Sequence, residues 1–98
     1  MSGVITVENS YVALLSLAEG FRTCSPPDFK SSVQCLLAIL NLPVHHQIIA
    51  KTHLQLGNLI MYNTTNHDTA SKHFEQAVRL IHYSIIREMT SLLILTLF

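Results

Sequence analysis

The sequence predicts an all-α protein, built of antiparallel helix pairs that form the start of an α-solenoid. Apolar residues recur at the helical spacing i, i+3, i+4 and i+7, and no stretch of useful length alternates apolar and polar residues as a strand does. A pattern of small and large residues also appears twice, the two copies lying 39 positions apart. A repeat of that length is typical of stacked helical units.

The clearer copy lies within residues 50–77. Its small residues would let two antiparallel helices approach closely, while its large residues fill the seam between them. The six positions are Leu56, Gly57, Ile60, Ala70, Phe74 and Ala77. This spacing resembles the tetratricopeptide repeat (TPR), whose signature runs L-G-x2-Y and then A-x3-F. One aromatic and one proline of the signature are missing, so a plain amphipathic helical hairpin is the alternative.

The second copy favours the repeat over the accidental hairpin. Residues of matching size stand 39 positions earlier, at Leu17, Ala18, Phe21, Ser31, Cys35 and Ala38. Six coincidences at one offset are hard to obtain by chance. We therefore expect two degenerate TPR-like pairs over residues 10–82. The expected packing residues are the six of the clearer copy, Leu56 to Ala77, together with Leu17, Ala18 and Phe21.

The first pair is expected to follow a flexible leader, residues 1–9. Asn9 or Ser10 can cap the first helix, which should end near residue 23. The run Ser25-Pro26-Pro27-Asp28 predicts the start of the second helix, because a serine cap, prolines in the first turn and an early acid all suit a helix N-terminus. That helix should extend to about residue 40.

The second pair begins after Asn41-Leu42-Pro43. Proline disfavours a helical residue before it and cannot donate a backbone hydrogen bond, so the second helix must end there. A third helix is expected over about residues 45–62. Asn66 is expected to cap a fourth helix beyond the following turn.

Residues 83–98 are predicted to form an apolar C-terminal helix, a truncated or aberrant third unit. Its apolar residues are interrupted by Arg87 and Glu88, and we expect it to be too short to span a bilayer, which takes about 20 apolar residues. Solenoid units generally need about three repeats for stability. The chain by itself is therefore expected to be marginally stable or to self-associate.

Composition excludes several classes of function. Hydrophobic residues make up 49% of the chain and charged residues 12%, which predicts a folded domain that hides apolar surface against a partner. Six basic residues balance six acidic ones, so no basic stripe is available for nucleic acid. The N-terminus has no basic region followed by a long apolar core, and we expect no secretory signal.

Two runs are more specific than the repeat pattern and resemble one family. TPR packing does not demand either of them: Phe21-Arg22-Thr23-x-Ser25-Pro26-Pro27 and Thr52-His53-Leu54-Gln55-Leu56-Gly57. Together with the flanking residues they resemble the N-terminal region of the TPR subunit of the cohesin loading complex, the Mau-2-type chromatid cohesion factors. The resemblance covers roughly residues 10–81.

The resemblance implies a function and a partner. Members of that family are several times longer, and form a helical superhelix that wraps the extended N-terminal segment of the large, Nipped-B-like loader subunit. By resemblance this chain is the N-terminal piece of a non-catalytic scaffold of the cohesin loader. It would act in sister chromatid cohesion and chromosome segregation, in the nucleus, associating with cohesin and chromatin indirectly and with no membrane.

Peptide capture is the binding mode expected of such a helix pair. The first helix of the second pair should present five residues to the concave wall: Lys51, Leu54, Asn58, Met61 and Tyr62. A generic TPR adaptor, such as a chaperone-tail clamp, is the alternative. A clamp needs several cations around a C-terminal carboxylate, and only Lys51 is well placed for that role.

Metal or catalytic chemistry is not expected. Of six histidines, His46 and His53 could share a face of the third helix, but neither an i, i+4 pair nor a cysteine pair converges with them. Cys24 and Cys35 occupy helix-packing positions with no acid or oxyanion donor. We therefore predict no catalytic residue, no metal ligand and no cofactor.

Overall fold

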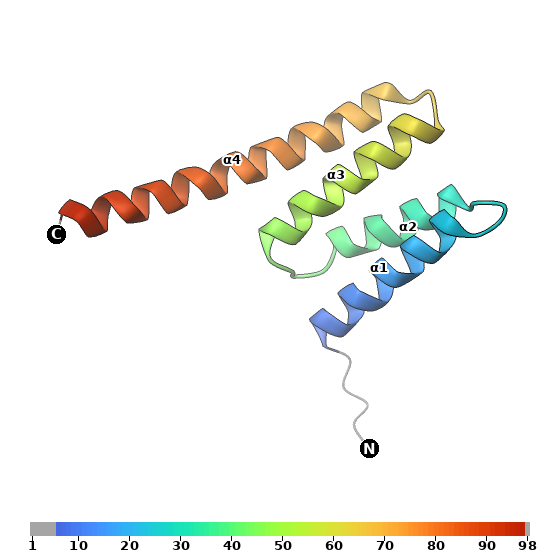
Figure 1. Cartoon of the computed structure of the whole chain (residues 1–98), viewed down its shortest axis with the longest axis horizontal. Helices are drawn as coiled ribbons and strands as arrows, with labels where there is room; N and C mark the ends of the chain where they lie inside the picture. Colours follow the sequence, from blue (N-terminus) through green and yellow to red (C-terminus); the bar gives the residue numbers. More distant parts are fainter. Residues whose placement is uncertain (1–5, 98) are drawn as a thin grey trace, which may run out of the picture.

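The computed structural model describes residues 6–97, which form four helices (Figure 1). These are α1 (Val7–Thr23), α2 (Phe29–Leu40), α3 (His46–Asn63) and α4 (His67–Leu97). Successive helices run in opposite directions, and each packs against the next along the chain. The described residues contain no strand, so the all-α prediction is confirmed.

The first helix begins earlier than predicted. Thr6 is the cap, since its hydroxyl accepts a hydrogen bond of 3.0 Å from the backbone N–H of Asn9. Glu8 adds a favourable acid in the first turn. Residues 7–9 are therefore helical and do not belong to the predicted leader. Residues 1–5 of that leader lie outside the described residues.

The second helix begins later than predicted, and its cap is Asp28 rather than Ser25. The Asp28 carboxylate accepts hydrogen bonds from the backbone N–H of Ser31 (3.1 Å) and from its hydroxyl (2.7 Å). Both prolines precede the helix. Proline disfavours a helical conformation at the residue before it, so Pro27 keeps Pro26 out of the first turn. The hydrogen bond from the Ser31 hydroxyl is the largest cause that lowers the pKa of Asp28 below its ordinary value, and the one from the Ser31 backbone N–H is the next.

Asp28→Ala should lower the melting temperature of the chain, whereas Ser25→Ala should leave it nearly unchanged. Because the pKa of Asp28 is lower in the folded state, its contribution is present above the unfolded-state pKa and is lost as the pH falls through the folded one. The difference between parent and Asp28→Ala should therefore shrink in acid. Thermal melts followed by circular dichroism check this, and equal effects of the two substitutions would argue for the serine cap.

The second pair begins close to where the sequence placed it. His45 caps α3, its Nδ1 accepting from the backbone N–H of Gln47 at 3.1 Å. The Asn66 side chain accepts from the backbone N–H of Thr69 at 3.3 Å, as predicted for the cap of the fourth helix. Local side-chain chemistry therefore fixes both helix starts.

The core joins α1, α2 and α3. Ala18, Leu36, Ile39 and Leu56 are buried together, with half-buried apolar side chains packed around them. The buried Ser32 hydroxyl donates a 2.8 Å hydrogen bond to the Ala18 carbonyl and so ties α2 to α1. A polar group inside this core is thus satisfied, as burial requires.

The seam between α3 and α4 is lined by small residues. Ala50 and Gly57 on α3, and Ala70 and Ala77 on α4, are buried. A Cβ atom added to Gly57 would lie only 2.6 Å from Cε1 of Phe74. Glycine therefore allows the Phe74 ring to lie against the α3 backbone.

The two copies of the size pattern are not buried alike. Of the predicted packing residues, Phe21, Ile60 and Phe74 are half-buried, while Leu17 is 52% exposed. The prediction that Leu17 packs in a seam is wrong. Its counterpart Leu56 contacts α2 of the preceding pair, whereas no described helix precedes α1.

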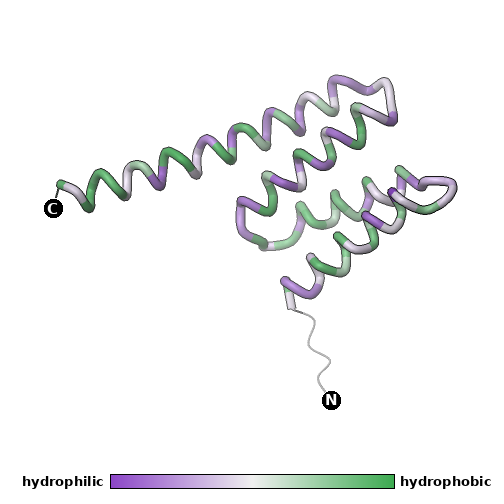
Figure 2. The backbone as a smooth tube through the Cα atoms, viewed as in Figure 1, coloured by the Kyte–Doolittle hydropathy of each residue, from purple (hydrophilic) through white to green (hydrophobic). Residues whose placement is uncertain are grey.

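The fourth helix is one continuous element of 31 residues, so the predicted boundary between residues 82 and 83 is wrong. No glycine or proline interrupts the sequence there. The C-terminal half of α4 extends beyond α3 and carries exposed apolar residues (Figures 1 and 2). The helix is long and apolar enough to cross a membrane, contrary to the expectation from residues 83–98 alone. A single helix of this kind, identified by length and composition alone, is weak evidence for a membrane span.

Candidate functional site

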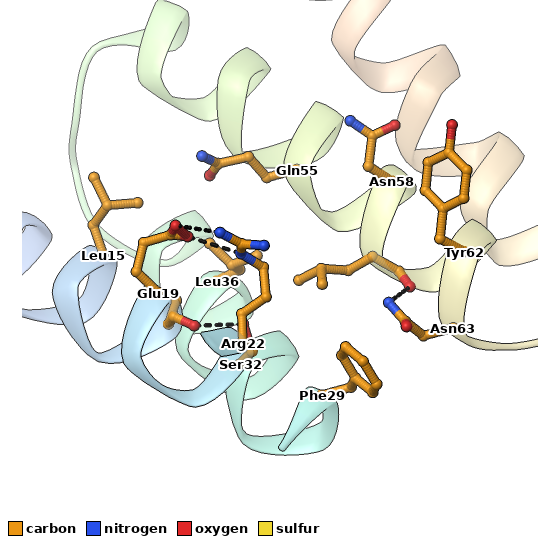
Figure 3. A pocket seen from close by; sticks show the side chains of 12 residues that line it. Leu15, Glu19, Arg22, Phe29, Ser32, Leu36, Gln55, Asn58, Tyr62 and Asn63 are labelled. Atoms are coloured by element: carbon orange, nitrogen blue, oxygen red, sulfur yellow. Dashed lines mark hydrogen bonds and ion pairs between the residues drawn. The ribbon is translucent and has the colours of Figure 1, made fainter. Parts of the chain in front are cut away.

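A groove of about 640 Å³ lies between α1 and α3, with α2 as its floor (Figure 3). Its floor is largely apolar, with Leu36 of α2 beneath Leu15 and Leu59 of the walls. Polar side chains line its sides: Glu19, Arg22, Gln55, Asn58, Tyr62 and Asn63. An apolar floor with a few polar groups along the walls is the usual build of a binding groove.

The α1 wall carries a surface ion pair. Arg22 donates two hydrogen bonds to the Glu19 carboxylate, from Nε at 2.9 Å and from Nη2 at 2.7 Å. The hydrogen bond lowers the pKa of Glu19 and raises that of Arg22. Among the described residues that line the groove, Arg22 is the only cation, and it is already paired.

The α3 wall presents amides and one aromatic ring. Asn63 uses its side-chain N–H to donate to the Leu59 carbonyl at 2.9 Å, leaving its oxygen as an acceptor. Gln55 and Asn58 are exposed and make no side-chain hydrogen bond within residues 6–97. The Tyr62 side chain is 78% exposed beside them. These groups can donate to and accept from a peptide backbone.

The groove brings together only two of the predicted contact residues, Asn58 and Tyr62. Lys51 lines a smaller groove of about 270 Å³ between α3 and α4. Leu54 and Met61 line neither groove. The sequence analysis did not find Glu19 and Arg22 as site residues, although their i, i+3 spacing and opposite charges were a readable signal for a pair on one helix face.

The structure places the histidine and cysteine side chains on several different elements. No group of three or more candidate ligands occurs within residues 6–97. His46 stacks on His45, with ring centroids 4.2 Å apart, while His53 contacts His73 of α4. Cys24 is exposed, not packed, because it follows the last residue of α1. Sequence spacing had not indicated the His53–His73 contact.

The family model for the cohesin loading factor matches residues 10–84, which include every residue lining the groove between α1 and α3. The chain is 46% identical over 81 residues to the MAU2 chromatid cohesion factor homolog of Drosophila virilis. The aligned region covers 79% of this chain and 13% of that protein. The identity to the Aedes aegypti homolog is 49% over 67 residues, or 68% of this chain and 11% of that protein. The Nematostella vectensis homolog is 42% identical over 78 residues, which make up 80% of this chain and 13% of that protein.

The chain thus spans only 11 to 13% of the length of these relatives. No solved structure matches the chain. A match over residues 10–84, together with identities above 40%, is decisive for family membership. This chain belongs to the cohesin loading factor family.

Proposed function

We propose that this chain is part of a non-catalytic scaffold subunit of the cohesin loader. Its groove between α1 and α3 would hold an extended segment from the N-terminal region of the large, Nipped-B-like subunit. The whole protein would then support cohesin loading and sister chromatid cohesion in the nucleus, reaching chromatin through its partners. The observation that carries the proposal is the groove itself, which lies wholly within the region matched by the family.

The size of the groove suits a short extended peptide. Its α3 wall runs from Gln55 to Asn63, which is about 12 Å at the rise of an α-helix. An extended chain covers that distance in about four residues. The apolar floor would receive side chains from one face of the peptide, while Gln55 and Asn58 hydrogen-bond to its backbone.

A carboxylate clamp is less well supported by the same groove. Such a clamp needs several free cations, and of the described residues lining this groove only Arg22 is basic. Its guanidinium is bound to Glu19. Lys51 lies seven residues before Asn58, on the same outward side of α3, but it lines the smaller groove between α3 and α4. We propose that it contacts the bound segment where that segment leaves the groove between α1 and α3.

Tyr62→Ala should weaken binding of the partner segment by about tenfold or more, because tyrosine is among the residues that commonly dominate interface energies. Its ring is 78% exposed, so stability should change little. The measurement is titration calorimetry of the 98-residue chain against a synthetic peptide from the N-terminal region of the large loader subunit.

The matched control is Tyr83→Ala, which removes a tyrosine that is 60% exposed on α4 and lines neither groove. It should bind like the parent. Parent-like binding by Tyr62→Ala, or no binding by the parent chain, would count against this groove as the partner site.

A further inference from the structure

His53 of α3 and His73 of α4 meet across the seam between their helices. Their Nδ1 atoms are 2.9 Å apart, the ring centroids 5.2 Å apart, and the rings are tilted by 33°. This centroid separation is close to the longest that a 2.9 Å nitrogen contact permits, so the two Nδ1 atoms face one another. In that arrangement one ring donates its Nδ1–H and the other accepts with the Nδ1 lone pair.

The pair lies beside the close contact between Gly57 and Phe74. Gly57 is one turn from His53 on α3, and Phe74, which packs on Gly57, is next to His73. Both imidazoles are half-buried. Small residues hold the two helix backbones close beside the pair, so a change in the contact between the rings acts directly on the seam.

Among the described residues, no carboxylate is a cause of the pKa shift of either ring. Burial is the first cause that lowers the pKa of both histidines, and the charge of His73 lowers that of His53 further. From α4, the titratable group facing His53 is His73. From α2, on the other side of α3, the one charged residue is Lys30, which is exposed.

We propose that His53 and His73 form a proton-operated latch on the α3–α4 seam. The pair tolerates one added proton, because the donating ring can accept it at its far Nε2 and keep its Nδ1–H bond. A second added proton must go to the accepting Nδ1. Two imidazolium N–H groups then point at each other, the hydrogen bond is lost, and α4 loosens from α3.

The direction of the pH effect follows from linkage. Each histidine has a lower pKa in the folded chain than the ordinary value of 6.5, which applies when the chain is unfolded. The seam therefore has its full stability above about pH 6.5. As the pH falls below that value the unfolded form takes up protons first, and stability declines until the folded pair is protonated as well. The groove between α1 and α3 is not part of this device.

The test is amide hydrogen exchange on the 98-residue chain at pH 7.5 and 5.5, with rates corrected for the intrinsic effect of pH on exchange. At pH 5.5 the amides of α4 that face α3 should lose protection severalfold more than those of α1 and α2. His73→Gln should keep protection at pH 7.5 and abolish the selective loss at pH 5.5. A glutamine amide can still donate to His53, but it cannot be protonated.

The control is His82→Gln, which removes an exposed histidine of the same helix and should respond to pH like the parent. The reciprocal His53→Gln variant should behave like His73→Gln, and it serves if that variant does not fold. Titration of the imidazole C–H signals of the parent adds a direct readout, with two coupled steps below the ordinary histidine range expected for the pair. Independent titrations in the ordinary range, or an α4-selective loss that persists in both glutamine variants, would overturn the latch.

Discussion

Leu56→Ala should lower the free energy of unfolding by about 2–5 kcal/mol, which would leave a chain of this size partly or wholly unfolded. The Leu56 side chain is 0% exposed and is surrounded by residues of α1 and α2 as well as α3. Removing it leaves a cavity where three helices meet, and rigid helices close such a cavity only in part. Urea unfolding of the 98-residue chain, followed by circular dichroism, measures the loss.

Leu17→Ala is the matched control. It makes the same substitution at the equivalent position in residues 17–38, the other copy of the pattern, where the side chain is 52% exposed. Exposed positions usually change stability by no more than about 0.5 kcal/mol. Equal losses for the two variants would mean that α1 buries its Leu17 face, and would contradict the arrangement of helices described above.

Gly57→Ala should destabilise the chain by about 1–3 kcal/mol, although alanine is the better helix former. The added methyl group would lie 2.6 to 2.9 Å from three carbon atoms of the Phe74 ring. The ring must shift, and α4 moves away from α3 or Phe74 leaves its position. Melting temperature and urea midpoint should both fall.

Gly20→Ala makes the same change in α1, where nothing lies within 4 Å of the added atom. It should stabilise the chain by about 0.5–1 kcal/mol through helix propensity. Phe74→Leu should then be less harmful in the Gly57→Ala background than in the parent, because the smaller side chain relieves the clash. If both glycine variants proved stabilising, the close approach of Phe74 to α3 would be wrong.

The sequence by itself determined the all-α class and the approximate starts of α3 and α4. It also singled out Gly57, Ala70 and Ala77, which are buried between those two helices, whereas Leu56 was expected in that seam and lies in the core with α1 and α2. Apolar periodicity, the break at Pro43 and the Asn66 cap act within about four residues along the chain, so they can be read locally. The sequence has no glycine or proline after residue 82, which favours a continuous helix, as observed in α4. The repeat pattern instead predicted that a new unit begins there. Local continuity was the better guide.

Only the tertiary structure decided which faces of those helices became sites. Leu17 and Leu56 share one pattern, yet only Leu56 has a preceding helix pair to bury it. Arg22 and Asn58 line the same groove, and His53 contacts His73, although the members of each pair lie on different helices. No periodicity along a single helix relates such positions. Burial and pairing depend on where a neighbouring helix comes to lie, and periodicity along one helix leaves that position undetermined.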